Sequence, residues 1–73
     1  MSQEATGFTI RLNGAEHSIG GDGTLTALIA GLGLKPGRIA VEINREIVPR
    51  ADYARVTLRP GDQIEIINFV GGG

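Results

Sequence analysis

Hydrophobic and polar residues alternate near the start of the chain in a pattern that predicts two paired strands. Residues 8–12 alternate strictly, and the pattern returns over residues 15–19 after an Asn-Gly pair. Asn-Gly supplies the two positive-φ positions of a type I′ turn, so the sequence predicts a β-hairpin. Pairing residue 12 with residue 15 directs one set of side chains to a single face of the sheet. This set is Phe8, Ile10, Leu12, His17 and Ile19.

The hydrophobic period then changes from that of a strand to that of a helix. Four hydrophobic residues recur at i, i+3, i+4 and i+7, namely Leu25, Leu28, Ile29 and Leu32. Thr24 is placed to be the N-cap, and Gly33 is placed to end the helix in the left-handed conformation. We predict one short amphipathic helix whose hydrophobic stripe packs into the core, because a domain of this size needs that stripe.

The second half of the chain is mostly extended. Residues 39–43 alternate again, Ile47 and Val48 follow a tight connection, and residues 50–59 predict a crossing segment with one turn of helix. A Pro-Gly-Asp turn at residues 60–62 leads into a terminal strand over residues 63–70. This order predicts an α+β fold of the ubiquitin-like β-grasp type, with a mixed four- to five-stranded sheet wrapped over one main helix. The predicted divisions are a flexible N-terminal segment 1–7, the domain 8–70 and a flexible glycine tail 71–73.

The terminal strand breaks its own pattern near its end. Along residues 63–66 isoleucines alternate with polar residues and are expected to face the helix. From that point Ile67 and Phe69 take the solvent-facing phase, where polar residues would satisfy folding. An exposed apolar patch of this kind is expected of a docking surface, whereas a local twist or bulge that turns Phe69 inward is the alternative. The residues predicted to dock a partner are Ile67, Phe69 and Val70.

The chain ends in Gly71, Gly72 and Gly73. Glycine adds no packing and loses much backbone entropy when ordered, so these residues contribute little to folding. They can instead carry the terminal carboxylate about 10 Å from the domain, at roughly 3.3–3.6 Å per residue. A carboxylate is a poor electrophile at neutral pH, so an ATP-using partner must activate it. Adenylation followed by displacement of AMP by a sulfur nucleophile is one route, and an inert frayed end is the alternative.

Composition excludes several other classes of function. The 73 residues carry seven basic and eight acidic side chains, a net charge of −1, with no basic stripe for nucleic acid and no membrane patch. No apolar run is long enough to cross a bilayer, and no signal sequence precedes the domain, which predicts a cytoplasmic protein. With no cysteine and a single histidine, the sequence predicts no metal site and gives little support for intrinsic catalysis. His17 is expected to be partly buried at the edge of the core, with a ligand or proton-transfer role as the minority interpretation.

Three stretches of the chain resemble the ThiS family, the sulfur carriers of thiamine thiazole biosynthesis. They are the segment Asn-Arg-Glu-Ile-Val-Pro-Arg at residues 44–50, the turn into the last strand at residues 60–64, and the short hairpin. Together with the terminal Gly-Gly, the resemblance covers residues 8–73. The family commonly has two terminal glycines, so the third lengthens the bare tail.

This resemblance implies a defined chemical role. The carboxylate of Gly73 would be adenylated by an E1-like activating enzyme, converted to a thiocarboxylate with sulfur from a donor protein, and delivered to thiazole synthase, while Gly71 and Gly72 give it reach. The protein would be a co-substrate rather than an enzyme and would hold no cofactor stably, since ATP is used by the activating partner.

Three other functions remain open at this point. A molybdopterin-type sulfur carrier shares the fold, the tail and the activation chemistry and differs in its acceptor. A ubiquitin-like modifier would form isopeptide bonds, although the single lysine, Lys35, argues against chains. A plain interaction domain with an inert end is the third.

Overall fold

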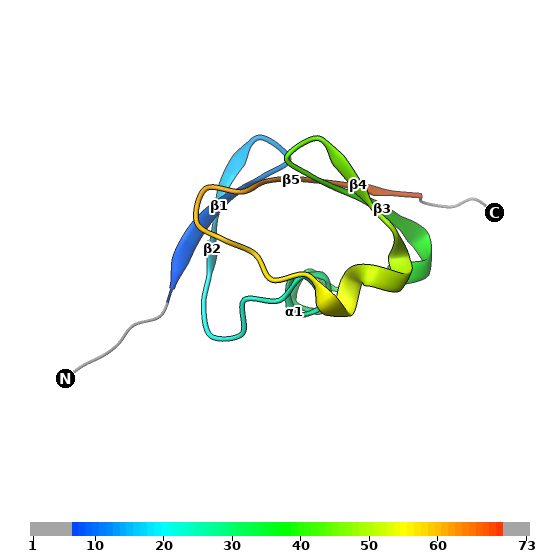
Figure 1. Ribbon diagram of the computed structural model, residues 1–73, viewed down its shortest axis with the longest axis horizontal. Helices are drawn as coiled ribbons and strands as arrows, with labels where there is room; N and C mark the ends of the chain where they lie inside the picture. The colour runs from blue at the N-terminus through cyan, green and yellow to red at the C-terminus, as the bar shows by residue number, and fades with distance from the viewer. Residues whose placement is uncertain (1–6, 70–73) are drawn as a thin grey trace.

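The computed structural model describes residues 7–69 and consists of a mixed five-stranded sheet that arches over one α-helix (Figure 1). The strands are β1 (Phe8–Leu12), β2 (Ala15–Ile19), β3 (Ile39–Ile43), β4 (Glu46–Val48) and β5 (Gln63–Asn68). The helix α1 spans Leu25–Gly31, and two 3₁₀ segments, η1 (Pro36–Arg38) and η2 (Arg50–Arg55), flank the second hairpin. The strand order is β2-β1-β5-β3-β4, with β1 and β5 parallel and the other neighbours antiparallel. This arrangement confirms the predicted α+β β-grasp fold.

Both hairpins turn through left-handed residues. The first pairs Leu12 with Ala15, as predicted, and its turn residues Asn13 and Gly14 have φ of 51° and 85°. The second joins β3 to β4 through residues 44–45, with φ of 52° and 73°. Its second position holds Arg45, where a left-handed backbone costs an L-residue with a side chain roughly 1–2 kcal/mol. At Arg45 the second turn is therefore held by its surroundings rather than by the preference of that residue.

The helix is capped at both ends as the sequence predicts, by Thr24 and by the left-handed Gly33. Thr24 is the N-cap, and its Oγ1 accepts a hydrogen bond from the amide of Ala27 at 3.2 Å. At the other end Gly33 has φ of 73°, and the amide of Leu34 donates to the carbonyl of Ile29 at 3.2 Å. This is the Schellman arrangement, which packs the residue after the glycine against the last turn.

The prediction that Leu32 lies on the buried stripe is wrong. Leu32 is the C-cap, one residue beyond the helix, and its side chain is 36% exposed. Leu34, which follows the left-handed Gly33, packs against the core in its place. The periodicity extends one position too far because the Schellman turn changes the direction of the chain before the stripe is complete.

The core lies between the concave face of the sheet and α1, with η2 and the following segment closing one side. Its buried members are Ile10, Ile19, Leu25, Leu28, Ile29, Ile39, Val41, Tyr53, Leu58, Ile64 and Ile66. None of the buried side chains in the described part of the chain is polar or charged, apart from the hydroxyl of Tyr53. The crossing segment is confirmed, since η2 supplies one short helical stretch and buries Tyr53.

Candidate functional site

The last strand, β5, lies in the middle of the sheet and is hydrogen-bonded on both sides. It pairs with β3 from Ile64, opposite Ile43, to Asn68, opposite Ile39. On the other side β1 pairs with it only at residues 63–64. Because β1 ends so early, the backbone groups of the later β5 residues that face β1 need another partner.

The side chain of Asn13 supplies that partner. Its Oδ1 accepts a hydrogen bond from the amide of Ile66 at 2.9 Å, and its Nδ2 donates to the carbonyl of Ile66 at 3.3 Å. The backbone amide of Asn13 donates to the carbonyl of Ile64 at 2.8 Å. The asparagine amide thus imitates one further residue of β1 and extends the parallel ladder around the turn.

Asn44 holds β5 from the opposite side in a similar way. Its side-chain Oδ1 accepts a hydrogen bond from the backbone amide of Gln63 at 3.0 Å. The backbone amide of Asn44 donates to the backbone carbonyl of Gln63 at 2.7 Å. Its Nδ2 donates to Oδ1 of Asp62 at 3.0 Å, which ties the turn before β5 to the second hairpin. We call Asn13 and Asn44 the asparagine pair. The Asn-Gly pattern predicts Asn13 only as a turn residue, and the presence of an asparagine in both hairpin turns is the one signal in the sequence that points to this second role.

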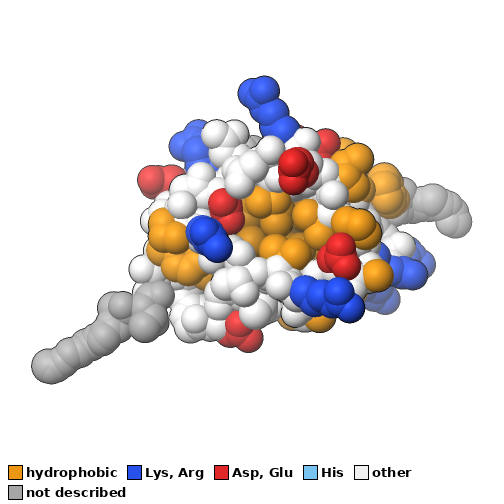
Figure 2. All heavy atoms as spheres, in the orientation of Figure 1, with side chains coloured by type: hydrophobic (Ala, Val, Ile, Leu, Met, Phe, Trp, Pro, Cys, Tyr) orange, Lys and Arg blue, Asp and Glu red, His pale blue; other side chains and the backbone are white. Residues whose placement is uncertain are grey.

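The exposed end of β5 carries the predicted apolar side chains. Ile67 is 59% exposed and Phe69 is 57% exposed, so the predicted outward orientation is confirmed and the inward alternative for Phe69 is wrong. The amide of Phe69 donates to the carbonyl of Arg38 at 2.8 Å, which continues the pairing with the β3 side past the end of the strand. Figure 2 shows hydrophobic side chains reaching the surface at this end of the molecule, beside the place where the described chain stops.

Four of the predicted site residues lie outside the described residues. They are Val70, Gly71, Gly72 and Gly73. The same holds for residues 1–6 of the predicted N-terminal segment. The structure therefore places Ile67 and Phe69 of the candidate site, and the roles of the tail stay predictions.

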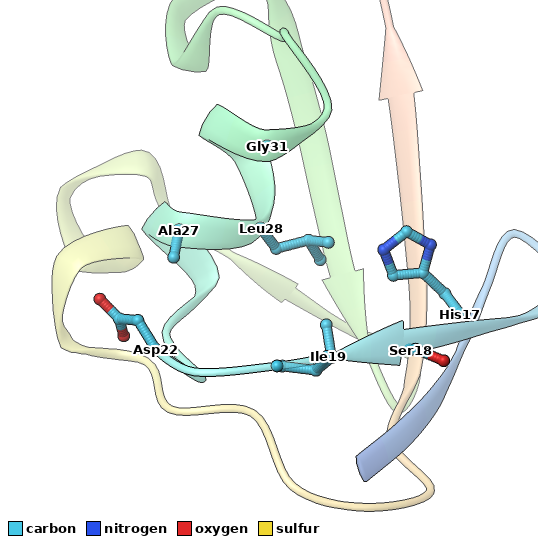
Figure 3. Close-up of a pocket in the computed structure, with 8 residues that line it drawn as sticks. His17, Ser18, Ile19, Asp22, Ala27, Leu28 and Gly31 are labelled. Atoms are coloured by element: carbon cyan, nitrogen blue, oxygen red, sulfur yellow. The ribbon is translucent and has the colours of Figure 1, made fainter. Parts of the chain in front are cut away.

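His17 lies beside an open pocket between β2 and α1. It is partly buried, as predicted, and its ring lies next to Leu28 on the side of β2 that faces the helix (Figure 3). The pocket holds about 210 Å³ and is otherwise lined mainly by aliphatic and backbone groups, with Asp22 near one end. Within residues 7–69 no group of three or more histidine, cysteine or acidic side chains could hold a metal ion. This geometry gives His17 no partner for metal binding.

Among the described elements, no helix combines the length and the hydrophobicity that crossing a membrane requires.

A small β-grasp domain whose central strand β5 carries outward apolar side chains at Ile67 and, just beyond it, at Phe69 defines the class of protein: the ubiquitin-like domains. Within that class, the sequence profile of the ThiS family matches residues 7–73, and the chain belongs to this family.

Three comparisons illustrate the similarity. The chain is 40% identical over 65 residues to the sulfur carrier protein ThiS of Bacillus subtilis, a match that covers 88% of this chain and 98% of that protein. It is 45% identical over 64 residues to a thiazole synthase of Magnetococcus marinus, covering 88% of this chain but only 20% of that longer protein. The crystal structure of a thiamine biosynthesis protein (ThiS) from Geobacter metallireducens superposes with a TM-score of 0.75 at 28% identity, covering 90% of this chain and 100% of that one.

We predict that Asn13→Gly lowers the free energy of unfolding by about 1–2 kcal/mol, because two side-chain hydrogen bonds to Ile66 are lost while the left-handed turn is kept. Urea unfolding measures this loss, and hydrogen exchange locates it at the amide of Ile66.

The matched control for this variant is Asn44→Gly, which removes the bond to the amide of Gln63 instead. The amide of Ile66 should therefore exchange faster in Asn13→Gly than in Asn44→Gly, and the amide of Gln63 should exchange faster in Asn44→Gly than in Asn13→Gly. An Ile66 amide that exchanges in Asn13→Gly as slowly as in the unaltered protein would contradict the role assigned to Asn13.

Proposed function

We propose that this protein is a sulfur carrier of thiamine biosynthesis whose active group is the C-terminal carboxylate of Gly73. The observation that carries the proposal is the match to the sulfur carrier ThiS of Bacillus subtilis over 98% of that protein's length. The position of β5 supports it, since a central strand held on both sides gives a rigid base to whatever follows it. The protein then serves as a co-substrate, and the enzymes that it visits perform the catalysis.

The chemistry of the tail proceeds in two transfers. The carboxylate of Gly73 attacks the α-phosphorus of ATP in the activating enzyme, which forms an acyl-adenylate and releases pyrophosphate. A persulfide of a donor protein then attacks the carbonyl carbon and displaces AMP, which leaves an acyl disulfide between Gly73 and the donor. A thiol of a partner protein attacks the donor's sulfur in that disulfide, so a protein disulfide forms and the thiocarboxylate leaves. No side chain of the carrier takes part, in keeping with a sequence that has no cysteine.

The glycines suit this chemistry for a steric reason. Gly71 and Gly72 have no Cβ, so the tail can pass through a narrow channel of an enzyme and allow in-line approach to the carbonyl carbon of Gly73. The carrier holds no cofactor of its own, and the ATP belongs to the activating partner.

The apolar end of β5 is the proposed docking surface for these enzymes. Ile67, Phe69 and Val70 directly precede the glycines, so a partner that covers them also receives the tail. Burying an apolar side chain of this size contributes about 1.5–3 kcal/mol, which suits a transient complex that must release its carrier.

The acceptor of the sulfur is proposed to be thiazole synthase. The Magnetococcus marinus relative that bears this name contains a segment 45% identical to this chain. That similarity favours the thiamine route over a molybdopterin acceptor, which would otherwise share the same fold and activation chemistry.

The proposal predicts an exchange of one oxygen for one sulfur at the C-terminus. After incubation with the activating enzyme of the same organism, ATP and a sulfur source, intact-mass analysis should show this change in the full-length chain. The variant that lacks Gly73 should show none, while its free energy of unfolding stays unchanged because the buried core lies within residues 10–66.

A chain that remains a carboxylate, in a reaction where a known carrier gains sulfur, would contradict the proposed function. Formation of reductant-resistant adducts with other proteins would instead favour a ubiquitin-like modifier.

The docking role of Phe69 can be tested by Phe69→Asp. We expect at least tenfold weaker binding to the activating enzyme, because a charge replaces apolar surface that the complex buries, and a change in stability within about 0.5 kcal/mol, because the side chain is already exposed. Calorimetric titration measures the affinity. Leu32→Asp is the matched control, since it places the same charge on an exposed leucine at the end of α1 and should leave binding unchanged.

A further inference from the structure

Two glutamates face each other directly on the outer surface of the sheet. Glu42 of β3 is paired with Glu65 of β5, and both lie on the face away from the core, since their neighbours Val41 and Ile66 are buried. Side chains that are directly opposite in an antiparallel pair have Cβ atoms about 4.5–5.5 Å apart, and like charges at such positions destabilise the sheet. Folding therefore gains nothing from this pair.

Apolar side chains surround the two carboxylates on the same face. In the same row, Ile47 of β4 is opposite Glu42 and is 75% exposed. In the next row, Ala40 of β3 is opposite the exposed Ile67 of β5. A flat surface that covers Ile47 and Ile67 together crosses Glu42, which is next to Ile47, and reaches Glu65, which precedes Ile67 by two residues on the same face of β5.

The nearest cation of the same sheet face is engaged elsewhere. Arg11 of β1 is paired with Gln63 of β5, one row away from Glu65. Its Nη2 donates to the carbonyl of Gly14 at 2.8 Å, inside the first hairpin turn. The guanidinium of Arg11 is thus directed to its own turn, and the two glutamates are placed to receive a positive group from a partner.

Burial of this pair has a defined electrostatic requirement. Removing a carboxylate from water without a counter-charge costs several kcal/mol, and two of them side by side cost more. The partner must therefore bring a positive side chain to this point. Arginine fits better than lysine, because its planar guanidinium donates in two directions and can bridge neighbouring carboxylates.

We propose that the outer face of β4, β3 and β5 is one docking surface, extending from Phe69 to Ile47, and that thiazole synthase seats an arginine between Glu42 and Glu65. This inference deepens the proposed function and rests on it. Thiazole synthase is the occupant because the Magnetococcus marinus protein of that name holds a segment similar to this chain within one longer chain, and a covalent link of this kind raises the effective concentration of the segment near the rest of its chain.

The test compares stability with affinity. Glu65→Gln and Glu42→Gln remove one charge each and keep the shape of the side chain. We expect each variant to bind purified thiazole synthase at least tenfold more weakly by calorimetric titration, since the partner's cation loses its counter-charge. The midpoint of urea unfolding should be unchanged or higher, because the repulsion between the pair is relieved. A change that merely damaged the fold would lower both quantities.

The matched control is Glu46→Gln on β4. Glu46 is opposite Ile43 and so lies on the other face of the same hairpin, and its variant should bind as the unaltered chain does. Glu42→Gln and Glu65→Gln chains that bind thiazole synthase with unaltered affinity would overturn the inference. The inference would also be overturned if the two variants weakened binding only to the activating enzyme. The same holds if this chain formed a dimer that the two variants abolish. Failure of the proposed function would be seen in a different experiment, as the absence of sulfur exchange at the C-terminus of the unaltered chain.

Discussion

The hydrogen bonding of β5 to β1 on one side and to β3 on the other fixes the sheet and the position of the residues that precede the tail. β3 supplies hydrogen bonds along its full length, while β1 is too short and the asparagine pair completes the ladder where the strands end. A slip of one residue would bury Glu65 and expose Ile64 and Ile66, so the register is strongly determined. The outward direction of Ile67 follows from that register, and with it the surface that precedes the tail.

Features that do not help folding collect on or beside the outer face of the sheet. Ile67, Phe69 and Ile47 expose apolar surface, Glu42 and Glu65 repel each other, and Arg45 adopts a left-handed backbone in the adjoining turn. The inner face shows the opposite character, since its buried side chains are almost entirely hydrocarbon. Local departures of this kind are expected where a surface is selected for a partner rather than for stability.

Local patterns in the sequence predict most of the fold, and contacts between distant segments account for the rest. Strict alternation and Asn-Gly are sufficient for the first hairpin, because every interaction in that hairpin is between near neighbours. The error at Leu32 arises because helical periodicity carries no information on the Schellman turn that brings Leu34 inward. The hydrogen bonds from Asn13 to Ile66 and the pairing of Glu42 with Glu65 can be predicted only when the order of the strands and the register of β3 on β5 are known. No local pattern in the sequence contains that information.

The most direct measurement follows labelled sulfur through a single turnover. The chain is loaded at Gly73 with isotopically labelled sulfur, freed of the activating enzyme, and mixed with thiazole synthase and its small-molecule substrates. We expect the label to appear in the thiazole in an amount equal to the carrier consumed, and the carrier to return to the mass of a carboxylate. Thiazole that forms without the label, or label that stays on the carrier, would contradict it.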